Sequence, residues 1–389
     1  MDRVTCDDAE TIGANIHRNM DNKMFLDVAL KRTDQVRTLH DLWKGDVQDK
    51  RRSTVIADSN VLFHRLIIII ERSDEVQSYF TYELTPAPCA LFKSGLMRKA
   101  NKPVLAQWLT SDVQSSSLPQ YVHYVLDGGA LLHRVRWAKK STFQEVVKQY
   151  VMYVHRWYGM KVNIVFDGYD SASNTKDHEH LRRKEKTKSV LLDVAVQNSH
   201  TIVIEQEHFL ANAVNKDRLI KLLVQAFEEA GMTAVQSCGD ADVSIMSTAL
   251  TLASQLDCSI AVVADDTDIL VLLLHHYMTT MQDIYFVSRP KKAQCSQFSI
   301  RAVRDKVGAT CCEQLPLLHA IGGCDTTSAL YGIGKAKVLK RITCNPANAQ
   351  HVAVMQNAQS SKDEVITAGL QLLIAVYGGQ KDETLGKLR

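Results

Sequence analysis

Between residues 121 and 287, short runs of apolar residues alternate with longer segments in which apolar residues recur every three or four positions. A short apolar run fits a strand that is buried on both faces, and the longer spacing fits a helix with one apolar face. We expect strands at 121–126, 162–166, 233–236, 260–264 and 283–287, and helices at 141–158, 217–230 and 241–255. Strands separated by helices predict an α/β fold, with a mostly parallel central sheet flanked by helices.

The residues before this alternation have a different pattern. The polar, serine-rich stretch SDVQSSSLPQ at 111–120 indicates a boundary. We expect residues 1–115 to form a mainly helical N-terminal extension, with helices at 34–43 and 55–72 and a loop at 97–102, and we can assign it no chemistry. The expected division of the chain is this extension (1–115), a core (121–290) and a helical C-terminal part (291–389).

Aspartates follow the first four expected strands. They are Asp127 and Asp167 after the first two, Asp240 and Asp242 after the third, and Asp265, Asp266 and Asp268 after the fourth; Asp325 lies in a later loop, in the segment GGCDTTS. A single aspartate after a strand usually caps the next helix. Because the carboxyl ends of parallel strands meet at one edge of a sheet, however, these carboxylates would crowd together and repel one another. A divalent cation would neutralise them, and oxygen ligands alone favour Mg²⁺ or Mn²⁺ over zinc.

The spacing within two aspartate pairs indicates a shared site. In the D-x-D segments 240–242 and 266–268, residues two apart in an extended segment would face the same side. Asp265 would face the other way, so we expect at most a helix cap there. Two divalent ions about 4 Å apart can activate a water molecule and stabilise a leaving oxygen in phosphodiester cleavage. The pattern therefore indicates a metal-dependent nuclease with two Mg²⁺ or Mn²⁺ ions.

Five segments also resemble motifs of the flap endonuclease/XPG family, a branch of the PIN-like 5′ nuclease superfamily. Along the chain they are VLDGGALLHR, IVFDG, GDAD, ADDTDIL and GGCDTTSALYGIGK, in the order that the family has. The resemblance runs from residue 121 to residue 342, and GCDTTSA is also similar to a segment of animal proteins. It implies a PIN-like, FEN-like nuclease core with a helix–hairpin–helix-type segment at 322–341.

The resemblance implies a role for each matching residue. The two metal ions would be held, directly or through water, by Asp127, Asp167, Asp240, Asp242, Asp266, Asp268 and Asp325. The scissile phosphate would be polarised by Lys176 and by Arg182 or Arg183, within an arch-like insert at 176–216 that admits single strands. His133 would stack on a base, with Arg134 beside it on the nucleic acid. Gly332, Ile333 and Gly334, with Lys335, would form a turn whose backbone amides hold duplex phosphates, often with a monovalent cation such as K⁺. Lys337 would also contact the nucleic acid.

The chain departs from the family in several places. The third motif of the family has two glutamates, whereas GDAD has two aspartates, whose side chains are one methylene shorter. His133 stands where the family has a base-stacking aromatic residue. The family begins almost at its first strand, whereas here a long segment precedes Asp127, and no sliding-clamp peptide is visible in the short region after Lys340.

Composition and charge restrict the class of protein and its partners. Hydrophobic residues make up 46% of the 389 and charged residues 23%, as in soluble globular proteins. The longest apolar runs, 66–70 and 269–274, are far shorter than the roughly 20 residues needed to cross a bilayer, so we expect no membrane partner. The net charge is only +3, but basic residues gather at 134–140, 176–188 and 335–341, next to the motifs. This distribution favours nucleic acid as the partner.

The spacing of cysteines and histidines does not fit a zinc site. The nine cysteines include no C-x-x-C pair, and the histidines, His319 among them, also lack zinc-site spacing, so we expect surface or core positions for them. Scattered cysteines and an acidic N-terminus without a signal-peptide pattern predict an intracellular protein. DNA as the substrate would favour the nucleus over the cytoplasm.

Three functions fit these patterns. The first is a metal-dependent nuclease that hydrolyses phosphodiester bonds in DNA near single-strand/duplex junctions and that, as the family resemblance implies, leaves a 5′-phosphate. The second is a PIN-type ribonuclease or a 5′→3′ exoribonuclease, since the acidic site is shared. The third is a catalytically inactive scaffold that binds nucleic acid or protein. The GIGK turn favours duplex DNA, and seven mutually repelling aspartates favour an enzyme over a scaffold.

Overall fold

The computed structural model describes residues 9–20, 68, 88–93, 96–169, 193–289, 296–380, 383 and 385. The chain divides into two compact units. The smaller comprises Met1–Arg98 with Ser328–Gly332, and the larger comprises Lys99–Thr327 with Ile333–Arg389. All the aspartates that the sequence singles out belong to the larger unit.

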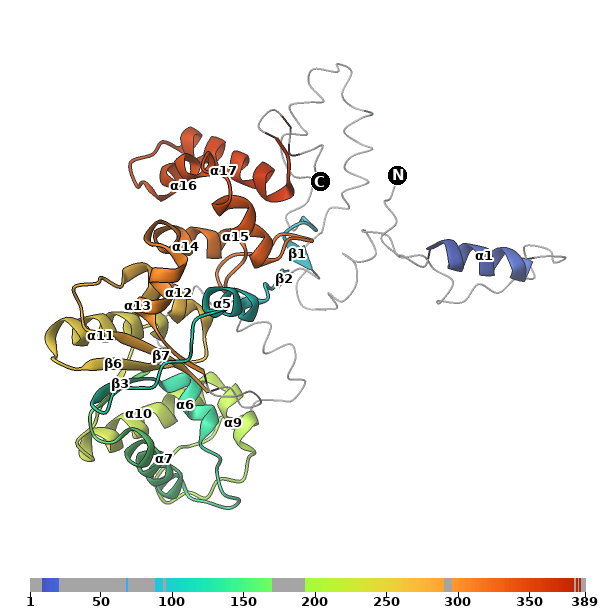
Figure 1. Cartoon of the computed structure of the whole chain (residues 1–389). Coiled ribbons are helices and arrows are strands. Elements are labelled where there is room, and N and C mark those ends of the chain that lie inside the picture. The colour runs from blue at the N-terminus through green and yellow to red at the C-terminus, as the bar shows by residue number, and fades with distance from the viewer. Residues whose placement is uncertain are drawn as a thin grey trace. The chain divides into compact units, whose positions relative to one another are not determined.

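A six-stranded sheet forms the centre of the larger unit (Figure 1). Its strands, in spatial order, are β5 (Thr233–Gln236), β4 (Val162–Phe166), β3 (Val122–Asp127), β6 (Ser259–Val263), β7 (Ile284–Ser288) and β8 (Ser296–Ser299). Neighbours from β5 to β7 pair in parallel, and β8 pairs with β7 in antiparallel fashion. The mostly parallel sheet predicted from the alternation is confirmed, and each expected strand lies within one residue of its predicted bounds.

The strand order reverses beside β3. The chain passes from β3 to β4 and β5 on one side, and then returns to place β6 on the other side of β3. Leu126 of β3 is in register with both Ile164 and Val263, so the three strands end at a similar level. In open α/β sheets, ligands bind in the crevice beyond the strand ends at such a reversal.

Helices cover both faces of the sheet. One face carries α6 (Gly128–Arg134), α7 (Phe143–Tyr158), α9 (Gln206–Ala211) and α10 (Ala213–Glu229), and the other carries α11 (Ala241–Gln255), α12 (Thr267–His276) and α13 (Ile300–Val307) (Figure 1). Successive strand residues point to opposite faces, yet neighbours such as Ile164 and Val165, or Val262 and Val263, are fully buried. Burial on both faces is the reason that short continuous apolar runs predict these strands.

A further layer of helices packs on α12. α5 (Lys102–Thr110) contacts α12, α13 and α15 (Lys335–Thr343), and α14 (Ala309–Ile321) contacts α12 and α15. α16 (Asn348–Gln356) and α17 (Lys362–Tyr377) follow. Leu105 and Leu109 anchor α5, since both are fully buried. The helix therefore belongs to the same unit as the sheet, although it lies within residues 1–115, to which the sequence analysis could assign no chemistry.

The sequence patterns did not predict α5, α6, α12 or β8. α12 buries Thr267, Ile269, Leu270, Val271, Leu273 and Leu274, so it is apolar almost all round and lacks the spacing of an amphipathic helix. The prediction for α10 began too late, at residue 217. The helix begins at Ala213 because the Asn212 side chain accepts hydrogen bonds from the N–H groups of Val214 and Asn215, at 2.9 and 3.3 Å.

The described residues of the smaller unit are few. They include α1 (Ala9–Met20) and a short antiparallel pair, β1 (Phe92–Lys93) and β2 (Leu96–Met97). The helices expected at 34–43 and 55–72 lie outside the described residues, apart from residue 68. Among the helices of the described part of the chain, none is both long and apolar enough to cross a membrane.

Candidate active site

A hollow of about 880 Å³ lies beyond the carboxyl ends of β3, β4 and β6. Six of the seven aspartates expected to hold metal ions line it, namely Asp127, Asp167, Asp240, Asp242, Asp266 and Asp325. The seventh, Asp268, lies beside Asp242 and Asp266. The structure thus brings all seven to one edge of the sheet, although they come from five separate segments of the chain.

Three of these aspartates cap the helices that follow their strands. Asp127 Oδ1 accepts a hydrogen bond from a backbone N–H of α6 at 3.1 Å. Asp240 and Asp266 accept hydrogen bonds from the N–H groups of Asp242 and Asp268, at 3.2 and 3.0 Å, at the starts of α11 and α12. The second residue of each pair therefore lies in a first helical turn, and our assumption of extended D-x-D segments was wrong. The positive end of the helix dipole favours carboxylates in this position and offsets part of their repulsion.

Glycines let the loops after β3 and β4 approach closely. A Cβ atom on Gly168 would lie 2.0 Å from a backbone carbonyl oxygen of the loop after β5. A Cβ atom on Gly129 would lie 3.2 Å from Asp127 Oδ1 and 3.3 Å from Asp167 Oδ2. These two carboxylates therefore face the same small volume, which a larger side chain at position 129 would fill.

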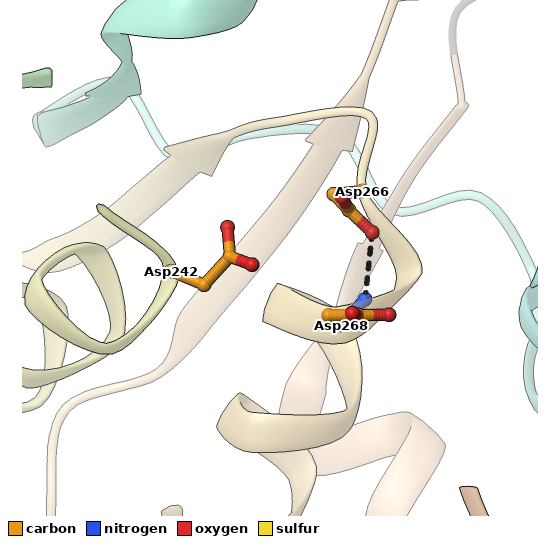
Figure 2. A group of neighbouring side chains, drawn as sticks. All are labelled: Asp242, Asp266 and Asp268. Atoms are coloured by element: carbon orange, nitrogen blue, oxygen red, sulfur yellow. Dashed lines mark hydrogen bonds between the residues drawn. The ribbon is translucent and has the colours of Figure 1, made fainter. Parts of the chain in front are cut away.

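Three aspartates lie close enough to share one cation (Figure 2). One carboxylate oxygen each from Asp242, Asp266 and Asp268 lies within 4.8 Å of the others. Figure 2 shows Asp242 on α11 beside the start of α12, where Asp266 precedes the helix and Asp268 lies in its first turn. Its dashed line marks the hydrogen bond that the N–H of Asp268 donates to Asp266. A donor set of carboxylate oxygens alone fits a hard divalent cation such as Mg²⁺ or Mn²⁺.

A lysine lies among the same carboxylates. The Nζ atom of Lys102, at the start of α5, is 2.9 Å from Asp268 Oδ2, 2.8 Å from Asp325 Oδ1 and 3.6 Å from Asp266 Oδ1. Only 14% of the Lys102 side chain is exposed. Sequence reasoning missed this residue because it lies in no motif and is 166 positions from Asp268.

A second lysine lines another part of the hollow. The Nζ atom of Lys216 is 3.9 Å from Asp167 Oδ2 and 5.2 Å from the centre of the Tyr169 ring. The sequence placed Lys216 at the end of an arch-like insert, whereas the structure places it in the first turn of α10. A lysine at this position suits a ligand with a negatively charged oxygen, such as a phosphate.

The carboxylates differ in how their ionisation is controlled. Burial raises the pKa of Asp127 to about 6. Neighbouring carboxylates also raise this pKa, and the hydrogen bond from the α6 backbone lowers it. Burial would also raise the pKa of Asp268, but the hydrogen bond from His319 and the charge of Lys102 hold it well below its usual range. For Lys102, burial acts to lower the pKa, and the surrounding carboxylates raise it above its usual value.

A buried chain of hydrogen bonds contacts Oδ1 of Asp268, the oxygen that does not face Lys102. His319 Nε2 lies 2.8 Å from Asp268 Oδ1, and Lys335 Nζ lies 2.9 Å from His319 Nδ1 and 3.0 Å from the His319 carbonyl oxygen. A protonated lysine can only donate, so Nδ1 accepts and Nε2 carries the proton that is donated to Asp268. Burial lowers the pKa of Lys335 to about 8. The Lys335 side chain, expected beside duplex phosphates, is instead buried with 3% exposed, and His319 is a core residue that contacts the site.

Three further predicted residues, Asp265, Arg134 and His133, lie at or beside the hollow. Asp265 does not cap α12, so that prediction was wrong. Its carboxylate accepts hydrogen bonds from Ser288 Oγ at 2.9 Å and the N–H of Arg289 at 2.8 Å, and it pairs with Arg134 Nη2 at 2.8 Å. The Arg134 side chain thus ties β6 and β7 to α6. His133 lines the hollow and is exposed, as a contact with nucleic acid requires.

Some predicted residues lie outside the described part of the chain. These are Lys176, Arg182 and Arg183, together with residues 176–192 of the expected arch-like insert. The rest of that insert, 193–216, is described. It packs on the core through Phe209 and Leu210, which are buried beside α7 and α10, so this part does not stand apart as an arch.

Some residues of the predicted phosphate-binding turn are exposed to solvent and others are buried. Gly332 has a φ of +69°, which favours glycine, and Ile333 is buried. Gly334 precedes α15 at the N-cap position, and Lys337 is exposed on that helix. The monovalent cation expected there stays a prediction.

The family model that matches this chain does not cover the residues of the hollow. A family model described as a domain of unknown function (DUF8702) matches residues 1–83. That stretch precedes every residue of the hollow. No curated protein matches the chain.

Several solved structures are similar to this chain in fold. The catalytic core of Rad2 in complex with a DNA substrate is 15% identical, with 70% of this chain and 77% of that chain covered and a TM-score of 0.36. Flap endonuclease-1 from Methanococcus jannaschii is 15% identical, with 68% and 83% covered and a TM-score of 0.37. The T5 D15 protein co-crystallised with metal ions is 13% identical, with 66% and 87% covered and a TM-score of 0.35. Likenesses at this level are too weak to establish an activity.

Proposed function

We propose that this chain is a metal-dependent nuclease that hydrolyses phosphodiester bonds in DNA, with a preference for junctions between single strands and duplex. The observation that carries the proposal is the convergence of seven aspartates on one edge of the sheet, with two lysines among them. Carboxylates that repel one another are costly to hold together unless a cation binds there. Phosphodiester hydrolysis uses such a site, because divalent cations and lysines stabilise the negative charge that develops on the phosphate.

The residues of the hollow divide this work. The aspartates would hold Mg²⁺ or Mn²⁺, and a bound ion would lower the pKa of a water molecule and polarise the phosphate. Lys216 would bind a phosphate oxygen beside Asp167. Asp127 and Asp167 face the same small volume and would orient the attacking water through their oxygens. His133, exposed at the rim, would contact the neighbouring nucleotide.

The choice of DNA depends on weaker features. The GIGK turn and the exposed Lys337 favour duplex phosphates, and the motif order resembles that of flap endonucleases. We expect Lys176 and Arg182 or Arg183 to act on the scissile phosphate from the insert. A DNA substrate also favours the nucleus as the site of action.

The proposal is tested by cleavage of labelled single-stranded DNA, duplex DNA, 5′-flap DNA and RNA, each with Mg²⁺, Mn²⁺ or EDTA. Wild type is compared with Asp242→Asn and with the control Asp363→Asn. Asp363 is exposed and is the second residue of α17, as Asp242 is the second residue of α11. We expect metal-dependent cleavage that falls about 100- to 1000-fold in Asp242→Asn and is unchanged in Asp363→Asn.

The other functions are outcomes of the same assay. Cleavage of RNA alone would assign the chain to the ribonucleases. Binding of nucleic acid without cleavage by folded protein, unaffected by Mg²⁺, would favour the scaffold and contradict the proposal.

A further inference from the structure

The ammonium group of Lys102 lies where a cation would bind. Its Nζ atom is 2.8 Å from Asp325, 2.9 Å from Asp268 and 3.6 Å from Asp266. Asp266 and Asp268 also belong, with Asp242, to the group of three that could hold one metal ion. A metal ion on that group and the Lys102 ammonium would therefore compete for the same two carboxylates.

Local structure does not explain why a lysine stands here. Lys102 is the first residue of α5, where the positive end of the helix dipole disfavours a cation. Burying an ammonium group is also costly unless it is paired, and this side chain is only 14% exposed. The surrounding carboxylates provide the compensation, so the position of Lys102 is explained by the acidic site and not by its own helix.

Packing fixes the start of α5 close to the aspartates. Leu105 and Leu109 are fully buried, and α5 contacts α12, which follows Asp266 and carries Asp268 in its first turn. α5 also contacts α15, which supplies Lys335 to the chain of hydrogen bonds behind Asp268. Lys102 is thus carried by an element that is built into the wall of the site.

The geometry of Asp268 points in the same direction. Its Oδ2 atom accepts from Lys102 at 2.9 Å, and its Oδ1 atom lies 2.8 Å from His319 Nε2. Both oxygens therefore have close donors, which makes direct coordination of a second divalent ion at this end unfavourable. Asp127 and Asp167, by contrast, face a shared volume beside Gly129, where the Lys216 ammonium is farther from its carboxylate, at 3.9 Å from Asp167 Oδ2.

We infer that Lys102 takes the place of one of two divalent cations, so that the chain binds a single divalent ion. The ammonium supplies the second positive charge at Asp266, Asp268 and Asp325. This deepens the proposed function and rests on it, because it takes the aspartates to be a site for divalent cations. It also replaces the two-ion expectation from the sequence with one ion and one lysine.

The test is a count of bound Mn²⁺ by isothermal titration calorimetry, checked by electron paramagnetic resonance, on the full chain without substrate. The variants are Lys102→Met, which keeps the length of the side chain and removes its charge, and Lys148→Met as a control. Lys148 is exposed on α7, away from the aspartates. We expect one ion in wild type, two in Lys102→Met and one in Lys148→Met. Two ions in wild type, or one in Lys102→Met, would overturn the inference.

The outcomes separate this inference from the proposed function. Wild type that binds no Mn²⁺ contradicts both, whereas wild type that binds two ions and cleaves DNA contradicts only the role of Lys102. Thermal unfolding in EDTA provides a second measurement. We expect Lys102→Met to melt at a lower temperature than wild type, with the difference removed by Mn²⁺. If Lys102→Met does not fold without metal, the number of Mn²⁺ ions bound by wild type still tests the inference, because two bound ions would overturn it.

Discussion

The two ends of the acidic hollow differ in how their negative charge is compensated. At the α12 end, Asp268 is held by Lys102 and His319, and Lys102 also contacts Asp325. At the β3–β4 end, Asp127 is enclosed beside another carboxylate, and its pKa is raised to about 6. At this end, Lys216 Nζ is 3.9 Å from Asp167 Oδ2.

This difference separates a structural ion network from a site for an external ion. Substitution of a carboxylate that has close cationic partners leaves those charges buried without compensation, and so destabilises the metal-free chain. Carboxylates held together without such partners lower its stability until a cation binds. Substitution of an aspartate should therefore have opposite effects on the metal-free protein at the two ends.

The largest effect is expected for Asp268→Asn. An asparagine amide would place a donor against either Lys102 or His319, and a buried ammonium would lose one of its closest partners. We expect the free energy of unfolding in EDTA to fall by about 3 kcal/mol, in the range found when one partner of a buried pair is removed. Chemical denaturation measures this, with Asp363→Asn as the control expected to stay within about 0.5 kcal/mol of wild type. A loss below 1 kcal/mol would remove the distinction between the two ends.

For Lys335→Met, we expect the free energy of unfolding in EDTA to fall by about 2 kcal/mol, because His319 Nδ1 and the His319 carbonyl lose their donor. Lys337→Met, two residues further along α15 at an exposed position, should leave the free energy of unfolding within about 0.5 kcal/mol of wild type. Affinity for duplex DNA in EDTA should show the reverse order, with Lys337→Met weakened and Lys335→Met unchanged. Weaker DNA binding by a folded Lys335→Met would return Lys335 to the phosphate-binding role that the sequence suggested.

For Asp127→Asn, we expect the free energy of unfolding in EDTA at neutral pH to rise by about 1–2 kcal/mol. A raised pKa means that the ionised carboxylate is less stable in the folded than in the unfolded chain, so its removal should stabilise the metal-free protein. Asparagine keeps the oxygen that caps α6. In saturating Mn²⁺ the gain should disappear, because the variant binds the ion less tightly. A variant less stable than wild type in EDTA would contradict the contrast.

The smallest effect is expected for Asp265→Asn. Asp265 is about one-third exposed, with 36% of its side chain accessible, and it pairs with Arg134 outside the group of seven. We expect a stability loss of about 1 kcal/mol or less and cleavage within about threefold of wild type. A loss of cleavage as large as that in Asp242→Asn would extend the site to Asp265.

The strands and the aspartates could be predicted because each follows from a local rule. Val162–Phe166 is a short apolar run, and such a run is compatible with few structures other than a doubly buried strand. Asp127 and Asp167 then had to reach one edge, since parallel strands end together. By contrast, α12 could not be recognised because its apolar residues surround it on all sides.

The cations of the site could not be predicted because they depend on packing between distant segments. Lys102 meets Asp268 across 166 positions, and His319 meets it across 51. Nothing in the stretch around Lys102 distinguishes it from an ordinary lysine at a helix start. Lys216 fell within a segment that the family resemblance assigned to an arch, so its place in the wall of the hollow became visible only from the fold.

The central claim is that the aspartates at the edge of the sheet bind a divalent ion. The most direct measurement is a crystal structure of the full chain with Mn²⁺, in which the anomalous signal locates the metal. A single manganese peak in the hollow, in contact with Asp127 or Asp167, is the predicted result. Saturating Mn²⁺ with no peak among the aspartates, or with peaks only elsewhere on the molecule, would contradict the account.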